Sequence, residues 1–188
     1  ADDKHNTVDD TPCGGGPGMV MRADVIDSAL SSISEIGDRP VVYLTPRGKT
    51  FDQKMARDFA DGPGIIFVCG RYEGIDERFL DMHKPQQVSL GDFVLSGGEP
   101  AAIAIIDCCI RHIPGILGDK ESLSEESFER GLLEYPHYTR PQLWRGRSVP
   151  EVLLSGHHKK ISNWRREQSE RLTRNHRPDL WSAYTAQQ

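Results

Sequence analysis

The fold is decided by residues 65–74, IIFVCGRYEG, where an apolar run ends in a glycine-bearing loop. The residues in front of it, 61–64 (DGPG), form a turn. A short apolar run between turn-forming residues is typical of a strand that is buried on both faces. Residues 65–69 therefore give the clearest strand in the sequence, and residues 70–74 are the loop at its carboxyl end.

The same order of apolar run and glycine-bearing loop occurs once before and once after this stretch. Residues 41–44 (VVYL) lead into residues 45–48 (TPRG), and residues 88–90 lead into residues 91–99 (GDFVLSGGE). Strands that alternate with helices predict an α/β fold with a largely parallel sheet. Apolar residues at helical spacing predict the helices at residues 23–36, 51–60, 75–82 and 100–112.

The three loops at the strand ends are the predicted ligand site. Ligands of open parallel sheets bind at the carboxyl ends of the strands. Glycine occurs in all three loops, and a residue without a side chain lets a ligand approach the backbone closely.

The helix expected at residues 100–112 is apolar almost all round, so we expect it to be buried on several sides. Arg111 lies near its end. A cation after such an apolar face needs a partner or a ligand, although helix C-termini favour Arg through the helix dipole as well.

The pattern changes after residue 118. Residues 119–127 are polar and acidic and indicate a linker, and the chain is then rich in Pro, Trp and Arg up to a helix expected at residues 162–174. The whole chain has a net charge of −5, but residues 139–188 hold ten basic and four acidic residues. This basic segment fits a phosphate-binding surface, although a solvated Arg-rich helix would have the same composition.

Several classes of protein are excluded by missing patterns. No G-x-G-x-x-G follows a strand and no P-loop motif occurs, so no standard nucleotide site is indicated. Residues 14–18 (GGGPG) follow no strand and are interpreted as a flexible or induced-fit loop. The His and Cys residues lack metal-ligand spacing, so we predict no protein-bound metal and free thiols of a cytoplasmic protein. No stretch approaches the ~20 apolar residues of a membrane span.

Five blocks of sequence closely resemble the TrmD family of bacterial tRNA (guanine-N1)-methyltransferases. They follow one another in order over nearly the whole chain, and GRYEGIDER and GDFVLSGGE are very specific. The blocks are residues 7–10 (TVDD) with 14–19 (GGGPGM), 68–78 (VCGRYEGIDER), 91–99 (GDFVLSGGE), 136–141 (PHYTRP) and 152–158 (VLLSGHH).

The resemblance implies a trefoil-knotted form of the α/β fold with a largely parallel sheet, followed by a small, mostly helical C-terminal domain. The expected divisions are a knotted domain at residues 1–117, whose N-terminal strand is apparently missing, an interdomain linker at residues 118–131, and a helical tRNA-binding domain at residues 132–188. The implied activity is methylation of nitrogen 1 of guanosine 37 in tRNA, with S-adenosylmethionine as donor.

The resemblance also assigns the binding residues. S-Adenosylmethionine is expected to lie in the knot and to be held mostly by backbone groups. The residues implied for it are Tyr43, Leu44, Thr45, Pro46, Gly70, Arg71, Glu73, Leu90, Gly91, Asp92, Phe93, Val94, Leu95, Gly97 and Gly98. The residues expected to contact the tRNA substrate are Asp9, Gly18, Ser122 and Arg140.

The catalytic groups implied are a carboxylate and a cation. The ring nitrogen must lose its proton as the methyl group arrives, and negative charge grows on the neighbouring carbonyl oxygen. The family uses a linker Asp as base and an Arg at the end of the buried helix as stabiliser. Arg111 matches that Arg, but the slot of the Asp holds Glu126. Glu125 is the alternative if the register shifts, and composition alone would make both solvated surface charges.

The resemblance further implies a homodimer with a composite active site, in which one subunit gives the knot and the other the linker and C-terminal domain. It implies Mg²⁺ dependence, and since the sequence shows no dedicated ligand cage, the ion is expected to arrive with tRNA or ligand. Two other functions stay open: a knotted methyltransferase that acts on a ribose 2′-hydroxyl, and an RNA-binding protein that has lost activity, as the change to Glu126 would allow.

Overall fold

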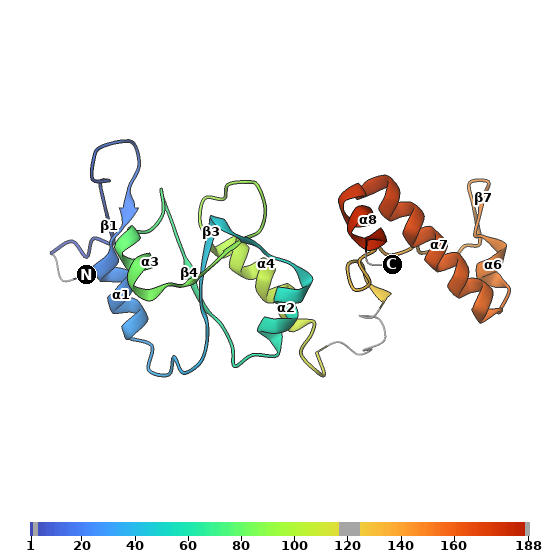
Figure 1. Cartoon of the computed structure of the whole chain (residues 1–188), viewed down its shortest axis with the longest axis horizontal. Coiled ribbons are helices and arrows are strands. Elements are labelled where there is room, and N and C mark those ends of the chain that lie inside the picture. The colour runs from blue at the N-terminus through green and yellow to red at the C-terminus, as the bar shows by residue number, and fades with distance from the viewer. Residues whose placement is uncertain (2–3, 117–124, 187–188) are drawn as a thin grey trace. The chain divides into compact units, whose positions relative to one another are not determined.

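The computed structural model describes residues 1, 4–116 and 125–186. The chain divides into two compact units, Ala1–Leu117 and Gly118–Gln188, whose elements are labelled in Figure 1. Within the described ranges, none of the helices has both the length and the apolar character needed to cross a membrane.

The N-terminal unit is built around a parallel sheet of three strands in the order β4-β3-β5. This arrangement of strands and helices confirms the predicted α/β class. Its elements, in chain order, are β1 (Asp9–Asp10), β2 (Val20–Met21), α1 (Ala23–Ser31), β3 (Val41–Thr50), α2 (Gln53–Ala60), β4 (Ile66–Cys69), α3 (Glu77–His83), β5 (Gln86–Ser89) and α4 (Glu99–Ile110).

The sheet is covered on both faces. Val42 and Leu44 of β3 pack with residues of α2 and α4, whereas Tyr43 between them packs with residues of α1 and α3. This alternation follows the two-residue period of a strand. Figure 1 shows α1 and α3 on one side of the sheet and α2 and α4 on the other. Burial on both faces is the reason why these strands are continuous apolar runs in the sequence.

Strand β3 extends to Thr50, six residues beyond the predicted end at Leu44. Its ladder with β5 is interrupted between Leu44 and Lys49, and both of these residues pair with Val88. Residues 45–48 therefore bulge out of the ladder with β5, and the strand then pairs with the same neighbouring strand again. Gly48 permits this return because a Cβ atom there would collide with the backbone of Val88.

Helix α1 is shorter than predicted, since it ends at Ser31 rather than at residue 36. The hydroxyl group of Ser32 donates a hydrogen bond of 2.7 Å to the carbonyl oxygen of Ala29. Bonds from Ser side chains to the nearby backbone compete with continuation of a helix, and the run of Ser at residues 31–32 places such a group at the helix end.

The prediction that the helix after the third loop is buried on several sides is wrong for the N-terminal unit as it stands. Ala102, Ile105 and Cys109 of α4 are buried, but Ile103 and Ile106 are 67% and 44% exposed. Apolar composition shows that a helix face should be covered; it cannot show whether the same chain covers it.

The C-terminal unit has a hairpin and three helices in its described part. Helix α7 begins four residues before the predicted Ser162, and α8 was not predicted. Pro178 suits the first turn of α8, and the Arg174 guanidinium of α7 lies 4.5 Å from the ring centre of Trp181. The elements are β6 (Leu143–Trp144), β7 (Arg147–Ser148), α6 (Glu151–Leu154), α7 (His158–His176) and α8 (Pro178–Thr185).

Candidate active site

The middle of β3, around the interruption that follows Leu44, and the carboxyl ends of β4 and β5 surround a cavity of about 230 Å³ in the N-terminal unit. Each of the three predicted loops contributes to its walls. The residues that line it are Tyr43, Leu44, Thr45, Pro46, Gly70, Arg71, Tyr72, Glu73, Gly74, Val88, Ser89, Leu90, Gly91, Phe93, Val94, Leu95, Ser96, Gly97, Gly98 and Ala101. The arrangement of parallel strands thus brings three separate sequence motifs to one place.

The second and third loops are joined through their backbones. The Gly98 amide donates a hydrogen bond of 2.9 Å to the carbonyl oxygen of Gly70, and Arg71 and Gly97 form an isolated β-bridge. A Cβ atom on Gly98 would lie only 2.8 Å from the Cα atom of Cys69. Glycine is therefore required at residue 98 because the two loops approach each other too closely for any side chain.

Tyr43 closes one side of the cavity with its ring. It is 4% exposed, and a Cβ atom on Gly70 would lie 3.0 Å from its Cε2 atom. Burial raises the pKa of the Tyr43 hydroxyl above its ordinary value. The hydroxyl group therefore stays protonated and neutral at physiological pH.

An ion pair links the second loop to the first turn of α4. The Arg71 guanidinium donates hydrogen bonds of 3.0 Å from Nε and 2.8 Å from Nη2 to Oε1 of Glu99. The hydrogen bond from the backbone amide of Glu99 and the bonds from Arg71 lower the pKa of the Glu99 carboxyl. Its Oε2 atom is shielded from solvent and accepts no hydrogen bond from the described residues. The site thus keeps a charged pair in contact with the cavity wall.

The glycine-rich loop ends beside the second loop. The Glu73 amide donates a hydrogen bond of 3.0 Å to the carbonyl oxygen of Met19. Gly18 has a φ of 85°, and a Cβ atom there would collide with the Glu73 side chain. Asp9, the other residue of this region expected to contact tRNA, lies in β1 and pairs with Met21 of β2.

Among the residues expected to hold adenosylmethionine, all of which the structure describes, only Asp92 does not line the cavity; it is exposed. Sequence reasoning missed several lining residues. Tyr72, Gly74 and Ser96 lie within the predicted loops, so their position was a usable signal. The others are placed by packing of the strands and α4, for which the sequence carries no local signal, and they are Val88, Ser89 and Ala101.

The two expected catalytic residues belong to different units. Arg111 is the C-terminal cap of α4 in the N-terminal unit and is half-buried. Glu126 is half-buried in the C-terminal unit, where it lines a hollow with residues of α7. Of the remaining residues expected to bind tRNA, Arg140 is exposed in the C-terminal unit, and Ser122 lies outside the described residues.

Glu125, next to Glu126, is held by two side chains of the C-terminal unit. The Tyr135 hydroxyl donates a hydrogen bond of 2.6 Å to its Oε2 atom, and Nη1 of Arg165 donates one of 3.2 Å to the same oxygen. The Arg165 guanidinium also lies 4.7 Å from the ring centre of Tyr135. Burial and the hydrogen bond to Glu125 raise the pKa of Tyr135 to about 12. The three side chains form one cluster, which we call the Glu125 cluster.

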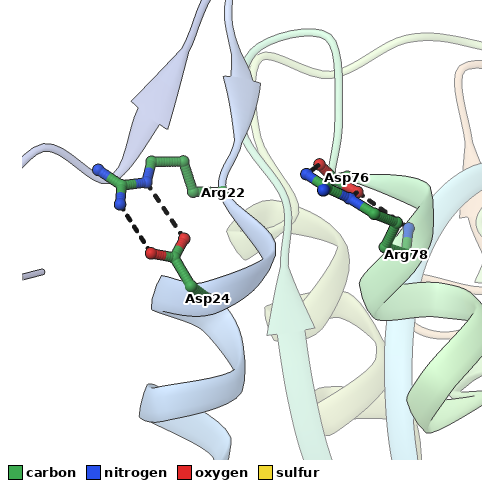
Figure 2. Close-up of polar contacts among 4 residues, drawn as sticks. All are labelled: Arg22, Asp24, Asp76 and Arg78. Carbon is green, nitrogen blue, oxygen red and sulfur yellow. Dashed lines mark hydrogen bonds and ion pairs between the residues drawn. The ribbon is translucent and has the colours of Figure 1, made fainter.

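Two further ion pairs lie at the starts of α1 and α3 (Figure 2). Nη2 of Arg22 is 2.7 Å from Asp24 Oδ2, and Nη2 of Arg78 is 2.6 Å from Asp76 Oδ2. In each pair the hydrogen bond from the Arg lowers the pKa of the Asp. In each pair one side chain is half-buried and the other exposed, and pairs near the surface contribute little to stability. Asp76 also accepts a hydrogen bond from the Arg78 amide and so caps the start of α3. Within the described residues, no three His, Cys, Asp or Glu side chains are grouped so that they could hold a metal ion.

Comparisons with known proteins agree on one family. The family model described as tRNA (Guanine-1)-methyltransferase TrmD matches residues 1–183. A relative from Rhodospirillum rubrum, named tRNA (guanine-N(1)-)-methyltransferase, is 58% identical over 186 residues, which cover 99% of this chain and 77% of the relative. Relatives of the same name from Mesorhizobium japonicum and Rhodopseudomonas palustris are 56% and 54% identical; the matches cover 98% and 100% of this chain and 80% and 75% of those relatives.

Proposed function

The chain belongs to the tRNA (guanine-1)-methyltransferase (TrmD) family, and from this premise we propose that it transfers a methyl group from S-adenosylmethionine to nitrogen 1 of guanosine 37 in tRNA, in the cytoplasm. The observation that carries the proposal is the convergence of three loops on one cavity. These are the loops to which the resemblance assigns the methyl donor.

The cavity suits adenosylmethionine in its chemistry. Glycines 70, 91, 97 and 98 have no side chain, so a ligand can approach the backbone of these loops closely. Leu44, Val88 and Leu90 offer apolar walls for a purine. We propose that the chain is threaded as a trefoil knot at these loops. Bound here, adenosylmethionine would supply a methyl group that its sulfonium centre makes electrophilic, and the broken sulfur–methyl bond would leave the neutral thioether S-adenosylhomocysteine.

In the proposed reaction, this chain's own residues handle the proton and the charge. The Glu126 carboxylate accepts the proton from nitrogen 1 of guanine while that nitrogen forms its bond to the methyl carbon. The Arg111 guanidinium stabilises the negative charge that grows on the guanine carbonyl oxygen at position 6. A Glu in place of the family's Asp keeps the carboxylate and adds one methylene, so it changes the reach of the base and leaves its chemistry intact.

The base is assigned to Glu126 rather than to Glu125 because the resemblance places the family's linker Asp at residue 126. One Glu125 oxygen already accepts hydrogen bonds from Tyr135 and Arg165. Through these bonds Glu125 holds its part of the chain to Tyr135 and Arg165 of the same unit, which is a structural role.

We propose that two copies form a homodimer with composite sites. Ile103 and Ile106 of α4 are exposed. In the third loop, Phe93 is 53% exposed and Val94 is 86% exposed. The cavity of about 230 Å³ is also smaller than the roughly 300–1,000 Å³ of most ligand sites. Both observations fit a second subunit that covers the apolar face and completes the walls. Any Mg²⁺ that the reaction needs is proposed to arrive with tRNA or donor.

The test is nucleoside analysis of an unmodified tRNA transcript after incubation with the protein and adenosylmethionine. We expect 1-methylguanosine in the guanosine-37 transcript and none in a matched transcript that has adenosine at position 37. Formation of a 2′-O-methylated nucleoside without 1-methylguanosine would assign the chain to ribose methylation. Binding of tRNA without any methylated nucleoside would make it a non-catalytic RNA-binding protein.

A further inference from the structure

The hairpin of β6 and β7 carries exposed side chains that have no role in the proposed reaction. Its strands pair Leu143 with Ser148 and Trp144 with Arg147. All residues from 141 to 148 are exposed, so neither face of the hairpin packs on the C-terminal unit. Leu143 is 62% exposed and Trp144 is 58% exposed. Two large apolar side chains that are adjacent in the sequence are thus exposed to solvent. The hairpin itself projects from the helices of its unit (Figure 1).

The turn of the hairpin fixes a cation against the indole ring. Arg145 and Gly146 have φ values of 49° and 76°, and a two-residue turn with positive φ at both positions matches the twist of paired strands. In this conformation the Arg145 guanidinium lies 5.2 Å from the centre of the Trp144 ring. The ring and the cation are therefore arranged together at the tip.

The charge of the segment points to a polyanion. Residues 138–150 contain Arg140, Arg145 and Arg147 and no Asp or Glu. Among the ion pairs of the described residues, none involves these three Arg, in contrast to Arg166 and Arg177, which pair with acidic residues of their own unit. Their charges are thus available to phosphate groups.

We propose that the β6–β7 hairpin binds the tRNA substrate by stacking Trp144 on an unpaired base while Arg145 and Arg147 contact the adjoining phosphates. This inference rests on the proposed function. Aromatic side chains that stack on single-stranded bases, together with Arg, are the usual means of binding unpaired RNA. A paired A-form stem does not offer its base faces, so the partner is an unpaired nucleotide, and the loop that carries guanosine 37 supplies such nucleotides. Arg140, already expected to contact tRNA, adjoins the hairpin.

The experiment measures the Kd of the full chain for a guanosine-37 tRNA transcript by filter binding at several salt concentrations. The variants are Trp144→Ala, Trp144→Phe and the double variant Arg145→Ala/Arg147→Ala, with Lys54→Ala as control, since Lys54 is an exposed cation of α2 that pairs with Asp58. Circular dichroism verifies that each variant is folded.

Trp144→Ala should raise the Kd about 10-fold, as removal of one stacked base does, and Trp144→Phe should restore most of the affinity. The affinity falls as salt is added, so a plot of log K against log salt has a negative slope. In the double Arg variant this slope should become less steep by about 0.7 for each phosphate that is no longer neutralised. Lys54→Ala should bind like the wild type. A fully paired RNA duplex should bind Trp144→Ala and wild type equally.

An unchanged Kd for Trp144→Ala overturns the inference. If Trp144→Ala changes the oligomeric state and leaves the tRNA affinity unaltered, the inference is also overturned, and the hairpin is an interface between copies of this chain. Formation of 1-methylguanosine by the wild type is measured in parallel. If the wild type methylates and Trp144→Ala binds normally, only the inference fails; if the wild type binds through Trp144 but never methylates, only the proposed reaction fails.

Discussion

The two units of the chain build their candidate sites from different parts of the polypeptide. In the N-terminal unit, the cavity loops are joined through backbone groups, as in the bond from the Gly98 amide to Gly70. In the C-terminal unit, the hollow around Glu126 is organised by side chains, with Tyr135 and Arg165 on Glu125. A site of the first kind is sensitive to any added atom, whereas a site of the second kind depends on particular functional groups.

We propose that this difference accounts for the departure from the family pattern that the resemblance implies in the linker. Two glycine-bearing blocks of the N-terminal unit, residues 68–78 and 91–99, resemble the family pattern, and at Gly98 the backbone of Cys69 leaves no room for a side chain. The resemblance implies Glu126 at the position of the family's linker Asp, and a carboxylate on a side chain can be lengthened while its chemistry is kept. We therefore expect added atoms to disturb the N-terminal site, and loss of particular functional groups to disturb the C-terminal site.

The largest effect should come from Glu126→Gln, which tests the dependence of the C-terminal unit on functional groups. A general base contributes typically about 10²–10⁴-fold, so the single-turnover rate of methylation should fall by about that factor while tRNA affinity is kept. Glu125→Gln is the matched control and should fall less than ~10-fold. If Glu125→Gln is the more damaging change, the base is Glu125.

The next effect should come from Gly98→Ala, which tests the backbone site. The added methyl group would lie 2.8 Å from the Cα atom of Cys69, and overpacking of this kind costs about 1–3 kcal/mol. We expect lower stability in denaturant titration and weaker adenosylmethionine binding in calorimetry. Gly62→Ala is the control, because its Cβ atom would be at an ordinary 3.4 Å from the nearest carbonyl oxygen. Equal behaviour of the two variants would contradict the backbone account.

A smaller effect should follow from Tyr135→Phe, which removes one hydrogen bond of the Glu125 cluster and adds no atoms. The loss of a partly exposed hydrogen bond to a carboxylate should cost about 1 kcal/mol of unfolding free energy. Tyr138→Phe, at a tyrosine that is 49% exposed, should cost nearly nothing. If adenosylmethionine affinity falls with Tyr135→Phe, the backbone site and the side-chain site are coupled rather than independent.

The smallest effect should be the pH dependence of the Arg71–Glu99 pair. The pKa of Glu99 is lowered in the folded state, so its contribution to stability is complete above the ordinary Glu pKa and is lost as the pH falls through the lowered value. The difference in unfolding free energy between wild type and Glu99→Gln should therefore shrink between pH 6 and pH 3, as denaturant titration at each pH can measure. A difference that stays constant or grows on acidification would contradict the pairing.

The sequence predicted what depends on local pattern. The apolar runs at residues 41–44 and 65–69 gave two strands with their exit loops, and these loops do line one cavity. The sequence did not predict the antiparallel pairs β1–β2 and β6–β7, because strands of two residues are too short to show a period. Nor could it show that Ile103 is exposed, because the covering partner of an apolar face is decided by tertiary structure.

Because β3 pairs with Val88 on both sides of its interruption, the number of residues between the two pairings is restricted during evolution. Loops at a protein surface usually accept insertions and deletions, but residues 45–48 are clamped at both ends, since Leu44 and Lys49 pair with the same residue of β5. Loss or gain of one residue would shift the second half of the strand by one position and turn every side chain in it to the opposite face. We therefore expect related chains to keep the length of this loop even where its residues differ, and to have their insertions and deletions in other loops.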